Sequence, residues 1–361
     1  MQFMPAPRRA RRSKSSKPRA RGVVILHNAP GCGPAGCVES DTGVLDQVRH
    51  VAAALQELGE PHRIVSVRYL MDVVEAVRRA QEDVVFNLVE ALVEAGAAAL
   101  VPGVCMAHGM ACTGASSRGL QVTQDKQLTK EILTTGGLPV PKGIVVAPGG
   151  RIDARRLPRG RLIVKPLAAD ASEGITAASV CDGAGTPLDM AVRRIHEQFG
   201  QPALIEQFVG TRELQAALLE ERWGVRLVTL AEIDFSAFPP GKPRIVDYAA
   251  KWLEHSFEYQ NTPRIIPAPV SANAQDKLQR AACTAWFLTG CHDYARVDFR
   301  MDEQERFFIL EVNANPDISP DAGYAAALAA DNTPFKKFVR IIVGNARRRM
   351  KQCTRRSSRT G

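Results

Sequence analysis

The sequence predicts an N-terminal α/β lobe with a parallel sheet, followed by an α+β region with mostly antiparallel strands. As far as about residue 115, short apolar strands alternate with helical patterns. This alternation is typical of parallel βαβ units. Beyond Pro141, strand-like runs follow one another at short intervals, a pattern that favours antiparallel pairing. The two patterns together predict a chain of more than one lobe, and 361 residues are enough for two or three.

The N-terminal lobe is predicted from three strands and the helices between them. The first helix runs from about Thr42, because its apolar residues have helical spacing, and Gly59 ends it. A second helix, with valines one to four residues apart, lies between the last two strands. The predicted strands are Val23–Leu26, Arg63–Val67 and Asp83–Leu88.

The α+β region begins after a helix rich in Lys and Leu, predicted over Thr123–Gly136. Further helices are predicted near residues 187–199 and 273–290. The strands are predicted at Ile144–Ala147, Leu162–Lys165, Ala203–Phe208, Leu214–Leu219, Val225–Phe235, Arg296–Arg300 and Phe307–Val312. The expected divisions of the chain are 1–22, 23–114, 115–208, 209–346 and 347–361.

The net charge of +9 is concentrated at the two ends. Residues 1–22 hold eight Lys or Arg and no acid, and residues 347–361 hold seven and no acid. The remainder carries 32 basic and 38 acidic residues, a net charge of −6. We therefore expect an acidic globule with two basic, disordered tails. Such tails either contact polyanions weakly and in a salt-sensitive way or have no binding role.

No apolar run approaches the roughly 20 residues that span a bilayer. The first apolar stretch is too short for the core of a signal peptide. We expect a cytoplasmic protein, with an Arg- and Ser-rich organelle transit peptide as the alternative.

The most informative polar residues lie on the last two predicted strands. Arg296 and Asp298 are two apart, as are Glu311 and Asn313, so each pair points to one face of its strand. Ionised groups on a half-buried face are costly unless they are paired or bind a metal. Two carboxylates and an amide oxygen suit Mg²⁺, and Arg296 beside them can hold phosphate. The alternative is a structural salt bridge between the strands.

Three lysines are candidates for holding a triphosphate, which needs several cations in addition to metal. Lys165 ends the strand Leu-Ile-Val-Lys-Pro, Lys126 begins a helix, and Lys251 follows Tyr-Ala-Ala. The loop Ala168–Gly174 after the strand could fold its amides over phosphate. The alternative for any one lysine is a solvated surface charge.

Glu206 is a single carboxylate on an otherwise apolar strand, Ala203–Val209. It could accept a hydrogen bond from an adenine amino group or a ribose hydroxyl, and a surface acid is an equal interpretation.

Together these residues resemble the ATP-grasp superfamily, and within it the D-alanine–D-alanine ligase family. The likeness extends from about residue 23 to 345. Its anchors are Val-Lys-Pro at 164–166, Ile-Glu-Gln-Phe at 205–208, Arg-Val-Asp at 296–298 and Leu-Glu-Val-Asn-Ala-Asn-Pro at 310–316. It implies a three-lobed fold in which two α+β lobes sandwich ATP. It also implies a reaction that joins a carboxylate to an amine through an acyl-phosphate, with Mg²⁺, or alternatively Mn²⁺, as the metal. Dimers are common in that family.

The resemblance also assigns nucleotide contacts. Lys126 and Lys165 would contact phosphates. Glu206 and the backbone near Val209 would meet the adenine, and Glu213 the ribose.

For the metal and the chemistry, the resemblance implies the following roles. Arg296 would stabilise the acyl-phosphate and the tetrahedral intermediate. Lys251 would lie near the γ-phosphate or the second substrate. Glu39 would hold the ammonium group of the first substrate, beside the retained loop serine Ser172. The implied magnesium ligands are Asp298, Glu311 and Asn313.

Departures from the family lie on the substrate side. Val89-Glu90 stands where the family has His-Gly, and Trp252 stands in place of a tyrosine. Ala171 and Ala322 occupy positions of substrate-binding serines, and Asp317 that of a glycine. Losing a buried hydrogen-bonding partner can change specificity by orders of magnitude. We therefore expect a related ligase of amino acids or peptides. The alternatives are a genuine D-alanine–D-alanine ligase, an ATP-dependent phosphotransferase, and a non-catalytic protein that binds polyanions.

Overall fold

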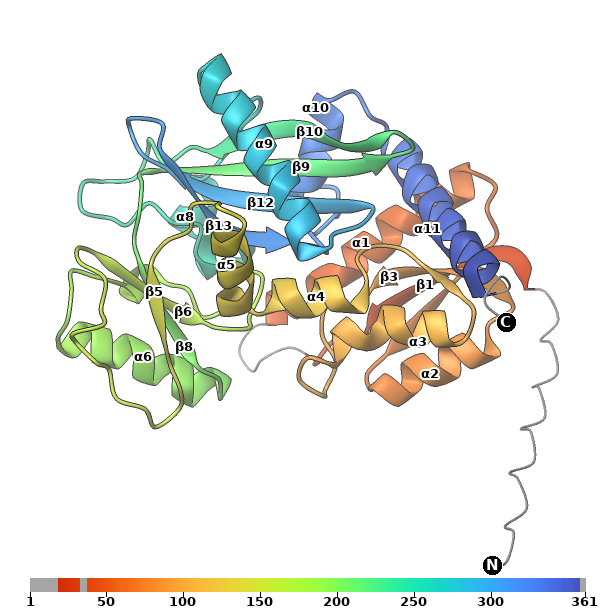
Figure 1. Ribbon diagram of the computed structural model, residues 1–361, viewed down its shortest axis with the longest axis horizontal. Coiled ribbons are helices and arrows are strands. Elements are labelled where there is room, and N and C mark those ends of the chain that lie inside the picture. The colour runs from red at the N-terminus through yellow and green to blue at the C-terminus, as the bar shows by residue number, and fades with distance from the viewer. Residues whose placement is uncertain (1–18, 33–37, 358–361) are drawn as a thin grey trace, which may run out of the picture.

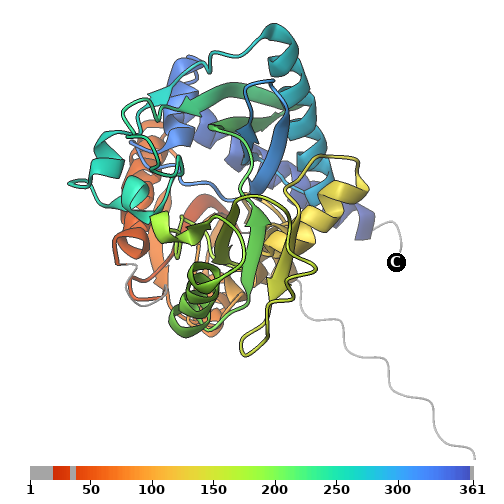
Figure 2. The same cartoon turned by 90° about the vertical axis from the view of Figure 1, so that its left-hand side faces the viewer.

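The computed structural model describes residues 19–32 and 38–357, with the side chains of residues 38–41, 356 and 357 outside that description. Its strands form three sheets (Figure 1). The view turned by 90° also shows the third sheet above the second (Figure 2). In the described part of the chain, no helix is long and apolar enough to cross a membrane.

The first sheet is parallel throughout, in the order β2-β1-β3-β4. Val23 and Ile25 of its central strand pack in the cluster that includes helix α1, while Val24 and Leu26 pack with α2 and α3. Alternate residues of a strand point to opposite faces, so helices cover both faces and the predicted αβα arrangement is confirmed. The elements are β1 (Ala20–Asn28), α1 (Val38–Glu57), β2 (His62–Val67), α2 (Leu70–Arg79), β3 (Glu82–Leu88), η1 (Ala97–Leu100), α3 (Val101–Ala107) and β4 (Ala111–Cys112).

The second sheet is antiparallel, in the order β5-β8-β6-β7, and α6 covers one of its faces. Val164 and Ile205 point toward α6, whereas the neighbouring Lys165 and Glu206 point to the opposite face. The elements are β5 (Gly143–Val146), β6 (Leu162–Pro166), η2 (Ala177–Ser179), β7 (Val180–Cys181), α6 (Thr186–Phe199) and β8 (Ala203–Gln207).

The third sheet is also antiparallel, in the order β11-β10-β9-β12-β13. Val297 and Val312 pack beneath α9, so the residues beside them face away from that helix. The polar faces of the second and third sheets therefore line the same cavity. The elements are β9 (Arg212–Glu221), β10 (Gly224–Ile233), α7 (Tyr248–Trp252), α8 (Phe257–Gln260), β11 (Arg264–Ile265), α9 (Ala272–Thr289), β12 (Tyr294–Met301), β13 (Phe307–Asn313) and α10 (Gly323–Ala330).

The single helix predicted over Thr123–Gly136 is wrong in one respect, because the structure has two helices there. They are α4 (Ser117–Gln124) and α5 (Lys126–Thr135). Asp125 between them has extended backbone angles, and its side chain accepts a hydrogen bond from the amide of Leu128. This is an N-cap, which satisfies a free amide at the start of a helix. It fixes the orientation of Lys126 at the first position of α5.

The expectation of two basic tails is also wrong where the structure describes them. Residues 20–22 belong to β1, and residues 347–357 form the last turns of α11 (Phe335–Ser357). Arg347 donates to Asp83 and Glu60, and Arg349 donates to the fully buried Asp293. The basic residues continue a helix whose apolar side is already docked, so acids of the folded lobe pair with them. Residues 1–18 and 358–361 lie outside the described residues.

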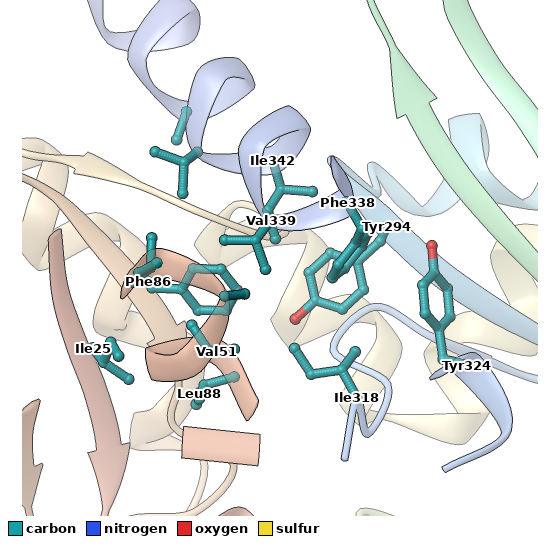
Figure 3. Packing of buried hydrophobic residues seen from close by; sticks show 14 of the residues in the cluster. Ile25, Val51, Phe86, Leu88, Tyr294, Ile318, Tyr324, Phe338, Val339 and Ile342 are labelled. Carbon is teal, nitrogen blue, oxygen red and sulfur yellow. The ribbon is translucent and has the colours of Figure 1, made fainter. Parts of the chain in front are cut away.

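A shared core joins the first sheet to the third through α11 (Figure 3). Phe338, Val339 and Ile342 of this helix are buried between Phe86 of β3 and Tyr294 of β12. Tyr294 and Phe338 meet edge to face with ring centroids 5.2 Å apart, a favoured aromatic geometry. The C-terminal helix therefore holds the N-terminal lobe against the sheet that carries Arg296 and Asp298.

Arg347→Gln is expected to lower the free energy of unfolding by about 2 kcal/mol at pH 7, because hydrogen bonds to charged groups have that magnitude. Burial alone would raise the pKa of Asp83 and Glu60. Hydrogen bonds from Arg347, aided by Gly22 and Arg21, outweigh this and hold both pKa values below their usual range. Carboxylates with lowered pKa values stabilise the fold above pH 4 to 5, and this stabilisation is lost as pH falls through the lowered values.

Urea unfolding of wild type and variant at pH 7, 5, 4 and 3 measures this. The difference between the two proteins should be constant from pH 7 to 5 and shrink below about pH 4. Lys351→Gln, on an exposed position of the same helix, is the control and should change little. A difference that is the same at pH 3 as at pH 7 would contradict the assignment.

Candidate functional site

A cavity of about 630 Å³ lies between the polar faces of the second and third sheets. It brings together every site residue predicted from the sequence except Glu39. That residue lies in the first turn of α1, and its side chain is outside the described part of the structure. The predicted residues that line the cavity are Lys126, Lys165, Ser172, Glu206, Val209, Glu213, Lys251, Arg296, Asp298, Glu311 and Asn313.

The predicted metal-binding residues occupy one face of the β12–β13 pair. In the antiparallel register Asp298 lies opposite Glu311, and Arg296 lies opposite Asn313. All four line the same cavity. Residues directly opposite on neighbouring strands have side chains close enough to interact. The two strands therefore present the oxygen-rich set to a common space, as their two-residue spacing predicted.

Arg296 and Asp298 form a buried ion pair along β12. The Nε and Nη2 atoms of Arg296 each donate to one carboxylate oxygen of Asp298, both at 2.7 Å. Burial raises the pKa of Asp298 although this guanidinium acts in the opposite direction. A salt bridge was the alternative interpretation of these residues, and one is present. It runs within a strand, however, and leaves Glu311 of β13 outside it.

Glu311 is the carboxylate that this pairing leaves available. Its carboxylate has no hydrogen bond or ion pair with any side chain described in residues 19–32 and 42–355, or with the described backbone. Burial alone would raise its pKa, but the positive charges of Lys126, Arg296, Lys165 and Lys251 outweigh burial and lower it. An ionised carboxylate without a bonded partner, facing a cavity, fits a bound cation.

The neighbouring oxygens also keep the capacity to bind a metal. Within the described part of the chain, Oδ1 of Asn313 accepts one hydrogen bond, from the amide of Asn315 at 3.0 Å, and each oxygen of Asp298 also accepts one. These oxygens have a second lone pair. The donor set therefore fits Mg²⁺, which takes few protein ligands and completes its shell with water and phosphate.

Glu206 lies between two lysines on the opposite wall of the cavity. Its carboxylate is 2.5 Å from Nζ of Lys165 and 2.8 Å from Nζ of Lys130, and all three side chains are at most 7% exposed. Burial by itself would raise the pKa of Glu206, but the two ammonium groups outweigh it and lower the pKa. The expected contact of Glu206 with adenine stays a prediction, and here its oxygens position lysines.

Lys130 is a site residue that the sequence reasoning missed. It also donates to the carbonyl oxygen of Leu310 at 2.8 Å, so it joins α5 to both sheets. Burial lowers its pKa to about 8 despite the attraction of Glu206. The available signal was spacing, because residues four apart on a helix share a face. Lys130 lies one turn after Lys126.

Arg300 contacts Glu213 and Val209, the residues predicted to meet the ribose and the adenine. It is a second residue that the sequence reasoning did not single out. Its Nη1 lies 3.3 Å from the Glu213 carboxylate, and its Nε donates to the Val209 carbonyl oxygen at 3.1 Å. Burial raises the pKa of Glu213 although Arg300 opposes this. Arg300 therefore fixes the place of both predicted nucleotide contacts.

The loop 168–174 is tied down at several points. The Ser172 hydroxyl donates to the Val246 carbonyl oxygen, and the Trp252 indole donates to that of Ala171, each at 2.9 Å. Nζ of Lys126 donates to the Ala169 carbonyl oxygen. Ala171 and Ser172 have φ values of 56° and 60°, in the left-handed region that non-glycine residues adopt at a cost. The contacts therefore hold a strained turn over the cavity.

Of the residues that depart from the family, Trp252, Asp317, Ala322 and Ala171 line the cavity, and Glu90 does not. The Glu90 carboxylate accepts a hydrogen bond from Gln47 at 2.7 Å, and the residue is exposed although protein atoms around the carboxylate partly desolvate it. This desolvation, with the negative charge of Asp317, raises its pKa to about 7.

The chain is similar in sequence and in fold to known proteins. The family described as "D-ala D-ala ligase C-terminus" matches residues 156–344, more than half of the chain. An uncharacterized protein of Sinorhizobium fredii is 27% identical over 73% of this chain and 75% of its own length. A D-alanine–D-alanine ligase of Streptomyces coelicolor is 30% identical over 68% of this chain and 62% of its own length. The solved structure of a D-alanine–D-alanine ligase from Bacillus anthracis complexed with ATP has a TM-score of 0.71 at 16% identity, covering 92% of this chain and 99% of that one.

The matched family, together with three sheets that have a cavity of cations and carboxylates between the second and third, makes the chain an enzyme of the ATP-grasp class, a C–N bond-forming ligase. Within that class, the chain belongs to the D-alanine–D-alanine ligase family.

Glu206→Gln is expected to lower the free energy of unfolding by about 3 kcal/mol or more, because it leaves two buried lysines without an anion. The matched control is Glu258→Gln, which breaks a glutamate–lysine pair that is 20–24% exposed. It should cost about 1 kcal/mol or less. Urea unfolding without nucleotide measures both. Equal losses in the two variants would show that Glu206 is not the buried anchor of the lysines.

Proposed function

We propose that this chain is an ATP- and Mg²⁺-dependent ligase that joins a carboxylate to an amine through an acyl-phosphate, with an amino-acid pocket that differs from that of D-alanine–D-alanine ligases. The observation that carries the proposal is the pair of facing polar walls. One presents Lys126 and Lys165, and the other presents Asp298, Glu311 and Asn313.

The residues on these walls have separate tasks. Bound ATP with Mg²⁺ would supply the phosphoryl group that activates the carboxylate. Glu311, Asp298 and Asn313 are the proposed metal ligands. Lys126 and Lys165 would hold phosphate oxygens, and charges fixed in advance are effective because they need no reorganisation during the reaction.

Arg296 and Lys251 are placed for the transferred group and the second substrate. Arg296 has its Nη1 atom left over from the pair with Asp298, and Lys251 has no ion pair among the residues that the structure describes. The loop 168–174, held over the cavity, would exclude water, which otherwise hydrolyses an activated acyl group. The amine then attacks the acyl carbon and phosphate leaves.

The altered pocket is supported by what surrounds Trp252. Its indole would be 2.8 Å from any Cβ at Gly43 of α1, so the ring closes the space between that helix and the loop. Ala171 and Ala322 cannot donate the hydrogen bonds of a serine. We propose that the site takes amino acids or peptides other than a D-alanine pair. A genuine D-alanine–D-alanine ligase is the alternative, which the names of the relatives favour.

Three further expectations stay predictions. They are a cytoplasmic location, a homodimer, and weak polyanion contact through the basic residues at the two ends of the chain.

The proposed reaction predicts release of phosphate and ADP only when a carboxylate substrate and an amine substrate are both present. A phosphate-release screen over paired D- and L-amino acids measures this. The highest rate should come from a pair other than D-alanine with D-alanine. If D-alanine alone gives the highest rate, the altered pocket is wrong. ADP formation with a stable phosphorylated product and no need for an amine would indicate a phosphotransferase.

Glu311→Gln is expected to lower the phosphate-release rate by about 100-fold or more, because it weakens the binding of the metal ion that would neutralise the transferred group. It should also raise the Mg²⁺ concentration needed for half-maximal rate, since an amide is a poorer magnesium ligand than a carboxylate. Glu303→Gln, in the exposed turn between the same two strands, is the matched control and should behave as wild type. Unchanged Mg²⁺ dependence in Glu311→Gln would contradict the metal assignment.

A further inference from the structure

Arg264 is an arginine at the cavity that the roles proposed so far do not use. It lies on β11, the edge strand of the third sheet, opposite Ile233 of β10. Its Nη1 atom donates to the carbonyl oxygen of Asp321 at 3.1 Å. No acidic side chain in residues 19–32 or 42–355 lies within ion-pair distance of it. The Nε–Nη2 edge of the guanidinium is left for another partner.

The charged group with the largest effect on the pKa of Arg264 is a second arginine. Arg264 is exposed on its edge strand, but protein atoms around it desolvate the guanidinium and lower its pKa. Arg296 in the same cavity lowers this pKa further, while Asp321 and Asp317 act in the opposite direction from beyond ion-pair distance. The positive charge of Arg296 is balanced by the carboxylate of Asp298, which accepts two hydrogen bonds from it. The edge of the Arg264 guanidinium that makes no hydrogen bond is therefore available to an anionic group of a substrate, because arginine pairs well with a carboxylate.

The position of Arg264 next to Gly323 is specific. A Cβ at residue 323 would lie 3.1 Å from Nε of Arg264 and 3.1 Å from Oε1 of Gln215. Glycine at this position therefore lets the guanidinium approach the start of α10. The residue before it, Ala322, is the N-cap of α10 and provides no side-chain hydrogen bond.

Ala322 is also where the resemblance places a serine that binds the carboxylate of the second substrate. The chain thus lacks that hydroxyl and has an arginine beside the same backbone. A guanidinium matches a carboxylate with two parallel hydrogen bonds, which a hydroxyl cannot do.

We propose that Arg264 binds the carboxylate of the amine substrate through its Nε–Nη2 edge, and that the amine substrate is therefore an amino acid or a peptide with a free carboxylate rather than a simple amine. This inference rests on the proposed ligase function. Arg264 is in this account a specificity-determining residue, because it touches the substrate and not the reacting atoms.

The test compares two amine substrates that differ in one group. The first is the amino acid that gives the highest rate in the phosphate-release screen, and the second is its carboxamide. Wild type should have a KM about 10- to 100-fold lower for the acid than for the amide, the range for a hydrogen bond to a charged group. Arg264→Gln should raise KM for the acid by about the same factor, leave KM for the amide and for ATP unchanged, and so abolish the preference.

Two further variants guard the interpretation. Arg264→Lys retains the positive charge but lacks the paired N–H groups of the guanidinium, and it should keep part of the preference for the acid over the amide. Arg280→Gln removes an arginine from the exposed side of α9 and should leave both KM values unchanged.

The outcomes separate this inference from the proposed function. If no amino acid supports phosphate release, the proposed function fails. If the enzyme is active but wild type does not distinguish acid from amide, or Arg264→Gln keeps the distinction, the inference alone is overturned. An equal loss of kcat/KM for acid and amide in Arg264→Gln and Arg264→Lys would show that the residue only holds the segment at 321–323, which also overturns it.

Discussion

The structure depends on one constraint, the two-residue alternation of side chains along the strands of the second and third sheets. Val164 and Ile205 pack under α6 because they alternate with Lys165 and Glu206. A shift by one residue would place charges under the helix and valine in the cavity. The same alternation on β12 and β13 buries Val297 and Val312 and exposes the acids to the cavity. The same strand register therefore both packs the core and assembles the site.

Charge balance within the cavity follows from this constraint. Charged side chains that leave water need partners, and several find them within the protein: Glu206 with two lysines, Asp298 with Arg296, and Glu213 with Arg300. Among the described residues, several charged side chains line the cavity without an ion pair. The bases are Lys126, Lys251 and Arg264, and the acids are Asp170, Glu254, Glu311, Asp317 and Asp321. These groups are available to bind a metal and the charged groups of substrates.

The C-terminal helix shows how distant parts of the chain complete the site. Helix α11 packs on α1, β3 and β4 of the first sheet and also contacts β9 of the third. Its arginines pair with acids of both, Asp83 in one and Asp293 at the start of β12 in the other. This explains why a run of basic residues that looks like a solvated tail in sequence is ordered in the fold. The helix continues through this basic run, but its many arginines and lysines make the run look like a tail in the sequence.

The sequence by itself determined the longer strands, their faces and the oxygen-rich set, but not the two-residue strands β4, β7 and β11. Period-two patterns predicted Arg296, Asp298, Glu311 and Asn313 on a common surface, because side-chain direction in a strand is a local property. Tertiary structure alone decided which of these charges are paired. The sequence could not show that Lys130 shares Glu206 with Lys165, that Arg300 holds Glu213, or that Arg264 lies against Gly323, since each contact joins elements far apart in the chain. Pairing depends on distances across sheets, and these are set by packing that no local pattern records.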